Sequence, residues 1–394
     1  MRSFVHTTLI NPLKAFMQDS RAIGVVLAAC TLVSLLLANT GGWQEAYRAF
    51  WTMHFDGGGS EHGHLGWLLF PNSPALVIND GLMAVFFFLV GMEIKREFHY
   101  GELSSIKHAT LPVAGAIGGM LAPTLLFMLF NKGGQYINGW GIPTATDIAF
   151  TLGVAGLLGK RIPVSLKIFI TALAIIDDLL AIIVIAFFYG GELQPGYLLA
   201  CVVIMVILWL LGKTKLRFGP LHWALGIVLW YCTYASGIHA TIAGVMFAFV
   251  VPPSQLGRFE LKLHTPVYFL IVPLFALANT AIYIPENITG ALNSRLSWGI
   301  LTGLCIGKPL GIVSACYLVV KKGFARLPKD TTWSLMIGGG MLCGIGFTMS
   351  IFISSLAFSV PEWQDISKIS VIVASVIAVL MGSAWLRMVK AKNR

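Results

Sequence analysis

Stretches of mostly apolar residues, each near the length of about 20 that a helix needs to cross a bilayer, recur along nearly the whole chain. No other feature of the sequence restricts the possible folds as strongly. The residues are 57% hydrophobic and only 11% charged, whereas a soluble domain is about 25% charged. The sequence therefore predicts an all-α, polytopic membrane protein.

Twelve of these runs are expected to be membrane-spanning helices. They cover residues 22–40, 76–94, 108–130, 142–159, 164–188, 196–212, 219–235, 238–252, 266–284, 298–320, 333–357 and 367–387. An even number of spans places both termini on one side of the membrane. No soluble domain is evident, so residues 1–394 are predicted to form a single membrane domain, with its longest external loop at 41–75.

The basic residues indicate which side of the membrane is cytoplasmic. Of the 27 lysines and arginines, 22 lie on the side of the termini, 4 lie on the opposite side, and Lys308 lies inside the tenth run. Loops that stay in the cytoplasm are enriched in Lys and Arg, so both termini are predicted to be cytoplasmic. The same bias accounts for the net charge of +10 without a nucleic-acid partner.

The cysteines give no indication of a cofactor, and none is expected. All six lie singly in apolar runs and none belongs to a CxxC pair, so neither a metal site nor a disulfide framework is indicated. His62 and His64, in the loop at 41–75, could bind a metal. The Gly-rich stretch around them is also typical of a solvated hairpin.

Two neighbouring carboxylic acids, Asp177 and Asp178, lie in the middle of the fifth run, "TALAIIDDLLAIIVIAFF". One ionised Asp at the centre of a membrane helix costs roughly 2.5–3.5 kcal/mol on insertion scales. Adjacent helical residues point about 100° apart, so one lysine does not readily satisfy both. A purely structural role therefore explains the pair poorly, which favours a functional one.

Three further polar residues stand alone in predicted spans, and each also has a structural interpretation. Asp147 in the fourth run could cap a helix, and Lys308 could extend along its aliphatic stem to an interface. His239, at the start of the eighth run, could cap or pack.

The fourth run is predicted to be an interrupted helix. Pro143 lacks an N–H, and Thr144 and Thr146 compete for backbone groups. Irregular backbone at membrane depth is tolerated where it lines a cavity or is buried in protein. Exposed helix ends there would need compensating charges, which Asp147 and Lys308 could supply.

The eleventh run has the same character, with a break expected near Gly344 and Gly346. Interrupted helices at matching positions of two halves indicate a transport site between inverted repeats. We expect the repeats at about 108–188 and 298–387. The glycines could instead serve close helix packing.

Several functions are compatible with intramembrane acids. An aspartyl protease needs two carboxylates that share a proton across facing helices, and Asp147 with Asp178 could do so, although vicinal acids diverge. A retinal Schiff base on Lys308 would suit a seven-span protein better. Oxygen ligands from Asp and Thr suit a hard cation such as Na⁺. A cation channel or a sodium-coupled symporter remains an alternative, but no cluster of polar or aromatic residues for an organic substrate is evident in the spans.

Five stretches resemble the bacterial NhaA-type Na⁺/H⁺ antiporters, and the likeness runs in order through the chain from about residue 16. They are "IPTATDIAFTLGVAGLLGKRIPVSLKIFITALAIIDDLLAIIVIAFFY" (142–189), "INDGLMAVFFFLVGMEIKREF" (78–98), "SGIHATIAGV" (236–245), "IGKPLGI" (306–312) and "CGIGFTMSIFISSLAF" (343–358). The resemblance implies twelve helices with the fourth and eleventh broken and crossing, in the bacterial inner membrane. It also implies a homodimer formed through the external hairpin, where this sequence is less similar.

The resemblance also implies roles for individual residues. Asp178 corresponds to the carboxylate that binds Na⁺ and carries protons, and Asp177 to its partner in ion binding or in pairing with Lys308. The Thr146 oxygen would lie near the ion, and Asp147 would compensate helix ends. Asp177 and Asp178 are thus the expected ligands of the transported Na⁺.

Positions linked to pH response in that family correspond here to His239, Glu93, Glu97, Arg258 and Glu260. The expected activity is export of Na⁺, and of Li⁺, in exchange for H⁺. It would be electrogenic, with about two H⁺ per Na⁺ so that the membrane potential contributes, and activated at alkaline pH.

Overall fold

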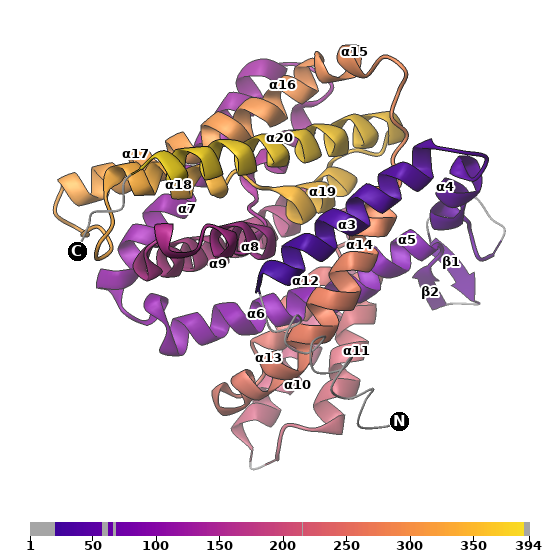
Figure 1. The fold of residues 1–394 in the computed structure, drawn as a ribbon. Helices are drawn as coiled ribbons and strands as arrows, with labels where there is room; N and C mark the ends of the chain where they lie inside the picture. Colours follow the sequence, from indigo (N-terminus) through magenta and orange to yellow (C-terminus); the bar gives the residue numbers. More distant parts are fainter. Residues whose placement is uncertain (1–19, 57–61, 66–67, 215, 390–394) are drawn as a thin grey trace, which may run out of the picture.

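The computed structural model describes residues 20–56, 62–65, 68–214 and 216–389, and helices dominate it (Figure 1). The first half contains α3 (Ser20–Asn39), α4 (Gln44–Thr52), β1 (His62–Leu65), β2 (Leu68–Pro71), α5 (Pro74–Leu76), η2 (Val77–Leu82), α6 (Met83–Tyr100), η3 (Glu102–Ser104), α7 (Ile106–Asn131), η4 (Ile137–Thr144), α8 (Ile148–Leu157), η5 (Gly159–Arg161) and α9 (Val164–Phe188). The second half contains α10 (Pro195–Lys213), α11 (Pro220–Ala235), α12 (Thr241–Ala248), α13 (Pro253–Pro266), η6 (Val267–Ile271), α14 (Val272–Asn279), α15 (Ile288–Leu292), α16 (Arg295–Thr302), η7 (Gly303–Gly307), α17 (Lys308–Lys321), α18 (Trp333–Leu342), α19 (Phe347–Ala357) and α20 (Pro361–Met388).

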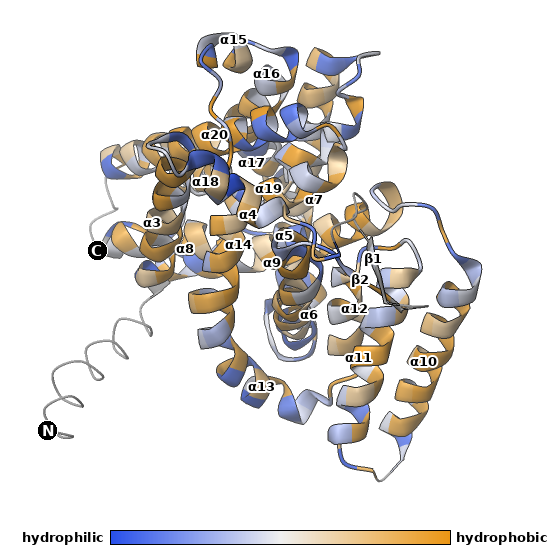
Figure 2. Ribbon diagram, turned by 90° about the vertical axis from the view of Figure 1, so that its right-hand side faces the viewer, coloured by the Kyte–Doolittle hydropathy of each residue, from blue (hydrophilic) through white to orange (hydrophobic). Residues whose placement is uncertain are grey.

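Many of these helices are long and apolar enough to cross a membrane. Within the described ranges there are eight such helices, and the bent pair α18–α19 could make a ninth. Three runs predicted to span are shorter helices here: α8 has 10 residues, α11 has 16 and α12 has 8. Figure 2 shows hydrophobic residues along most of the length of α10 and α11, with hydrophilic residues near the helix ends. The chain is therefore a multi-pass membrane protein.

Two segments differ from the sequence prediction. Residues 253–265, expected in a loop because of their charges, form α13, which continues through a π-helical turn, η6, into α14. The loop at 41–75 contains a further helix, α4, beside an antiparallel hairpin in which Leu65 pairs with Leu68. The hairpin lies beside α4 and α5 (Figure 1). The side chains of His62 and His64, which the sequence offered as possible metal ligands, lie outside the described part of the chain.

Helix α9, which carries the carboxylate pair, lies at the centre of the fold. In its most apolar 18-residue window 72% of the residues are buried, against 17% in α10. The outward face of α10 consists of apolar side chains such as Leu199, which is 66% exposed. Lipid would cover that face, whereas α9 is enclosed by protein.

Close backbone contact between α7 and α17 fixes the position of Lys308. A Cβ atom on Gly118 would lie 2.2 Å from the Gly311 carbonyl oxygen, and one on Gly311 would lie 2.0 Å from that of Gly118. Only glycine permits this approach. Lys308 begins α17 directly after the π-helical turn η7, one helical turn before Gly311.

Candidate functional site

Two interrupted helical segments meet inside the molecule. Residues 145–147 are extended between η4 and α8, and α18 and α19 are bent by 49° around 343–346. Each break bonds to the other, because the Asp147 N–H donates to the Ile345 carbonyl at 2.7 Å and the Thr146 hydroxyl donates to the Cys343 carbonyl at 2.8 Å. Backbone groups released by one interruption are thus satisfied by the other, as buried polar groups require.

Asp147 caps two helices with one carboxylate. Its Oδ1 accepts from the Phe150 N–H at 2.9 Å, as the N-cap of α8. Its Oδ2 accepts from the Thr348 N–H at 3.1 Å and from the Thr348 hydroxyl, in the first turn of α19. A negative charge between two helix N-termini is favourable. The sequence prediction missed Thr348, although its place just after the Gly344–Gly346 break was a usable signal.

Thr348→Val should lower the thermal stability of the protein. The substitution removes a donor to the buried Asp147 carboxylate, and a lost buried hydrogen bond to a charged group costs about 1–3 kcal/mol. Unfolding midpoints in detergent measure the effect. Thr302→Val is a matched control, because the Thr302 hydroxyl donates to the Trp298 carbonyl of its own helix and to no other group in the described part of the chain. Equal midpoints for the two variants would show that the Thr348 bond does not stabilise the junction.

A buried ion pair lies next to the two breaks. The Lys308 Nζ is 2.7 Å from Asp177 Oδ2, and the two side chains are 0% and 1% exposed. Lys308 also donates to the Thr144 carbonyl, at the end of η4. The ion pair therefore joins α9, α17 and the first broken segment, and each charge is the partner that the other needs in a low-dielectric interior.

Asp178 is buried without such a partner. Its residue is 3% exposed, and its Oδ1 has no hydrogen-bond partner within the described ranges. Leaving a buried carboxylate oxygen unsatisfied is costly, and a proton or a cation would relieve that cost. The described residues contain no group of three or more His, Cys, Asp or Glu side chains that could hold a metal ion, so a cation here would need hydroxyl, carbonyl or water oxygens besides the two carboxylates.

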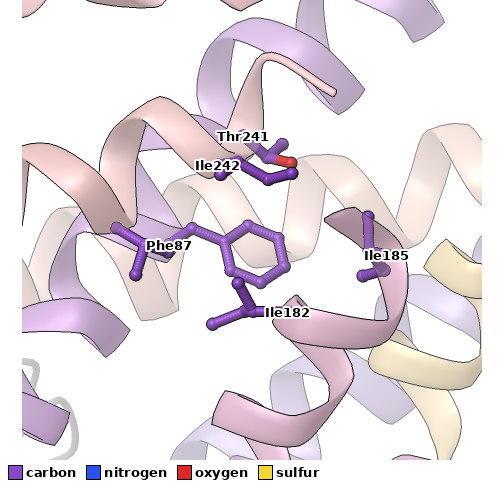
Figure 3. Close-up of a pocket in the computed structure, with 6 residues that line it drawn as sticks. Phe87, Ile182, Ile185, Thr241 and Ile242 are labelled. Carbon is purple, nitrogen blue, oxygen red and sulfur yellow. The ribbon is translucent and has the colours of Figure 1, made fainter. Parts of the chain in front are cut away.

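Apolar side chains close the α9 face beyond Asp178. Ile182 and Ile185, four and seven residues further on, lie on the same face of the helix. Figure 3 shows them beside Phe87 of α6 and Ile242 of α12, and the gap between these side chains is too small for a water molecule.

Three of the residues expected to govern pH response, Glu93, Glu97 and Glu260, lie around Arg96, whereas Arg258 and His239 lie apart from them. Glu260 of α13 accepts a hydrogen bond from Arg96 of α6, and Arg96 also lies 3.6 Å from Glu97. Arg258 is exposed, on the opposite face of α13 from Glu260, and forms no ion pair in the described part of the chain. Arg96 is thus the cation beside Glu260. Sequence reasoning missed it because α13 was expected to be a loop.

His239 occupies a different place. It lies in the short link between α11 and α12, where its Nε2 is 2.6 Å from the carbonyl oxygen of Tyr189, which ends α9. The Tyr189 hydroxyl in turn accepts from the Gly141 N–H at 3.0 Å and donates to the Asn138 carbonyl at 2.8 Å. Tyr189 is roughly 16 Å along α9 from Asp178 at the α-helical rise, so His239 does not touch the carboxylate pair.

Comparison with known proteins gives one consistent result. A family model described as Na⁺/H⁺ antiporter 1 matches residues 14–386. The chain is 44% identical over 392 residues to the Na⁺/H⁺ antiporter NhaA 1 of Flavobacterium johnsoniae, which covers 98% of this chain and 99% of that protein. It is 42% identical over 384 residues to the Na⁺/H⁺ antiporter NhaA of Escherichia coli O139:H28, with 95% and 97% covered. For the Na⁺/H⁺ antiporter NhaA of Cytophaga hutchinsonii the identity is 44% over 381 residues, with 95% of each protein covered.

Proposed function

The chain belongs to the Na⁺/H⁺ antiporter 1 family, and we propose that it exports Na⁺, and Li⁺, from a bacterial cell in exchange for H⁺ across the inner membrane. The observation that carries this proposal is the buried Asp178 Oδ1, which has no hydrogen-bond partner among the described residues, close to the Asp177–Lys308 ion pair. Asp178 needs either a proton or a cation to balance its buried charge, and the neighbouring Asp177 could supply a second carboxylate if it separated from Lys308. Such a site suits a cation that competes with protons.

The proposed architecture has twelve spans in a single domain over 1–394, with α8, α11 and α12 completing the long helices. Inverted repeats would cover about 108–188 and 298–387, with spans 4 and 11 broken and crossing. Two contacts support this: the hydrogen bonds between the two breaks, and the glycine contact between α7 and α17, the first helices of the two repeats. Both termini are proposed to be cytoplasmic, and a homodimer would form through the external hairpin.

In the proposed cycle, Na⁺ and H⁺ occupy the same carboxylates in turn. When Na⁺ arrives, Asp178 releases one proton, the Asp177–Lys308 pair opens and releases a second proton from Asp177 or Lys308, and Asp177 joins in binding the ion, with the Thr146 oxygen nearby. When Na⁺ leaves, Asp178 takes up one proton, the second proton returns to Asp177 or Lys308, and the Asp177–Lys308 ion pair forms again. A buried carboxylate that holds neither Na⁺ nor a proton, and has no cationic partner, is unfavourable because its charge has been removed from water. The site therefore exchanges one ion for the other, which couples their transport.

The other functions considered fit this geometry less well. Asp147 is committed to two helix caps, so it is not free to share a proton with Asp178 in the manner of an aspartyl protease. Lys308 is paired with Asp177 rather than placed in a pocket for a retinal. Measuring Na⁺ efflux from proteoliposomes at a set membrane potential distinguishes an exchanger from a channel or a symporter.

Exchange should be electrogenic and should need no added solute. If one Na⁺ displaces protons from two groups, Asp178 and either Asp177 or Lys308, each cycle carries one net positive charge inward. A negative-inside potential then drives Na⁺ out, with roughly 2.3 kcal/mol per 100 mV. The test uses proteoliposomes loaded with Na⁺, with the potential set by K⁺ and valinomycin. We expect Na⁺ efflux to accelerate as the inside becomes more negative. Efflux that ignores the potential would contradict the two-proton cycle, and a requirement for an organic solute would indicate a symporter.

Exchange should increase from acid to alkaline pH, because protons compete with Na⁺ for the site. The pH midpoint of exchange should be set by the Arg96 cluster, which consists of Arg96, Glu97 and Glu260. In Arg96→Gln, Glu260 loses its neighbouring cation, which favours its protonated form. If ionisation of this cluster activates transport, the midpoint moves to higher pH. Arg258→Gln is the matched control, because Arg258 is exposed and unpaired within the described ranges. A shift of equal size in both variants would reject the cluster as the determinant.

The same pH profile assigns a role to His239. Histidine titrates in the relevant range, but His239 contacts the end of α9 rather than the carboxylates. We expect His239→Ala to leave the midpoint within a few tenths of a unit of wild type, because Tyr189, which His239 contacts, lies roughly 16 Å along α9 from Asp178. A large shift would instead make His239 a pH sensor that acts through the Tyr189 carbonyl.

A further inference from the structure

A cleft of about 810 Å³ lies where α7 and α9 begin and where the chain leaves α17. Its walls come from η3, α7, α9 and the loop at 323–329. None of its lining residues belongs to the carboxylate site. We propose that this cleft binds the headgroup and upper acyl chain of an anionic phospholipid from the cytoplasmic leaflet, a proposal that rests on the membrane orientation proposed above.

The charged residues that line the cleft favour a negatively charged ligand. Lys107, Arg326 and Lys329 line it, whereas Glu102 is its single acidic lining residue and lies 3.6 Å from the imidazole of His108. Three cationic side chains would repel Na⁺, so the cleft is a poor access route for the transported ion. They suit a phosphate group, to which Lys and Arg donate strong hydrogen bonds.

The interior of the cleft is apolar, which a small inorganic anion would not need. Leu111 of α7, Ile168 and Phe169 of α9, and Leu327 line it. Leu111 and Phe169 are buried, whereas the three cationic lining residues are exposed. Phe324 is 68% exposed beside them. A phosphate-binding rim above an apolar wall, at the ends of membrane-crossing helices, matches the two chemical halves of a phospholipid.

The loop that supplies two of the cations is held in place. Gly323, two residues after the end of α17, has a left-handed φ of 79° and lines the cleft together with the loop that follows it. The Ser165 hydroxyl, at the start of α9, donates to the Lys329 carbonyl. The cations are thus presented by an anchored loop. They also lie on the side that carries most of the basic residues, where the cytoplasmic leaflet is anionic.

The test measures lipid-dependent thermal stabilisation of the full-length protein in detergent. Phosphatidylglycerol is titrated against phosphatidylcholine of the same chain length and against inorganic phosphate. For the triple variant Lys107→Gln, Arg326→Gln, Lys329→Gln we expect the half-saturating phosphatidylglycerol concentration to rise roughly tenfold or more. The charge-keeping triple Lys107→Arg, Arg326→Lys, Lys329→Arg should bind as wild type does, which separates lost binding from misfolding.

A second triple, Lys262→Gln, Lys322→Gln, Arg387→Gln, removes the same charge from exposed positions that do not line the cleft. An equal loss in this control would show non-specific surface attraction and would overturn the proposal. Stabilisation by inorganic phosphate equal to that by phosphatidylglycerol would also overturn it, in favour of a free-anion site. Sodium–proton exchange is measured in parallel, so intact exchange without lipid selectivity rejects the lipid site alone.

Discussion

Asp178→Asn should reduce Na⁺/H⁺ exchange to background while leaving the protein folded. An amide cannot release a proton at physiological pH and offers Na⁺ no full negative charge. Folding should survive, since Asp178 Oδ1 has no hydrogen-bond partner within the described ranges to lose. A neutral amide also relieves a buried charge, so the unfolding midpoint should be equal or higher.

Inverted membrane vesicles with a respiration-driven proton gradient provide the measurement for this variant, because added Na⁺ dissipates the gradient only if exchange occurs. Asp147→Asn is the matched control: the same chemical change, in a buried Asp whose role is to cap helices. Asn is also a good N-cap, so that variant should retain measurable exchange. Wild-type exchange in Asp178→Asn, or total loss in both variants with normal folding, would contradict the assignment of Asp178.

Lys308→Ala should destabilise the protein strongly. It leaves Asp177 as a buried, unpaired charge, and breaking a buried pair from one side costs about 3–5 kcal/mol. The Thr144 carbonyl also loses its donor. Removing both charges should cost less than removing one, so Lys308→Ala with Asp177→Asn should recover part of the lost stability.

Thermal unfolding with and without Na⁺ tests the Lys308 pair. In wild type, Na⁺ should replace Lys308 as the partner of Asp177. Saturating Na⁺ should therefore narrow the difference in midpoint between Lys308→Ala and wild type. If Lys308→Ala melts as wild type does in both conditions, or if the double variant is the least stable of the three, the buried pair does not hold these helices together.

The sequence predicted best those elements that depend on local properties. Residues 164–188 were expected as a span, and α9 has these bounds, because the apolar run is continuous and Pro163 precedes it. Helix α13 was missed, because its charges resemble those of a loop. Its helical structure depends on packing against α6, which brings Glu260 to Arg96.

The charges of the site were predictable from composition, and the family resemblance implied the pairing of Lys308 with Asp177 that the structure contains. Buried acids and a lysine in apolar runs stand out from composition alone. The geometry that brings Lys308 to Asp177 depends on the crossing of α7 and α17 and on a π-helical turn before Lys308. Neither feature has a reliable signal in a single sequence.

Competition between Na⁺ and H⁺ for Asp177 and Asp178 is the central claim, and counting the protons released on Na⁺ binding tests it most directly. Calorimetric titrations of the purified protein with NaCl, in two buffers of different ionisation enthalpy, yield that number. We expect about two protons per Na⁺ near the pH midpoint of exchange, since metal binding requires deprotonated ligands. Asp178→Asn should show no such coupled binding. Wild-type protein that binds Na⁺ without releasing protons, or Asp178→Asn protein that releases as many as wild type, would contradict the claim.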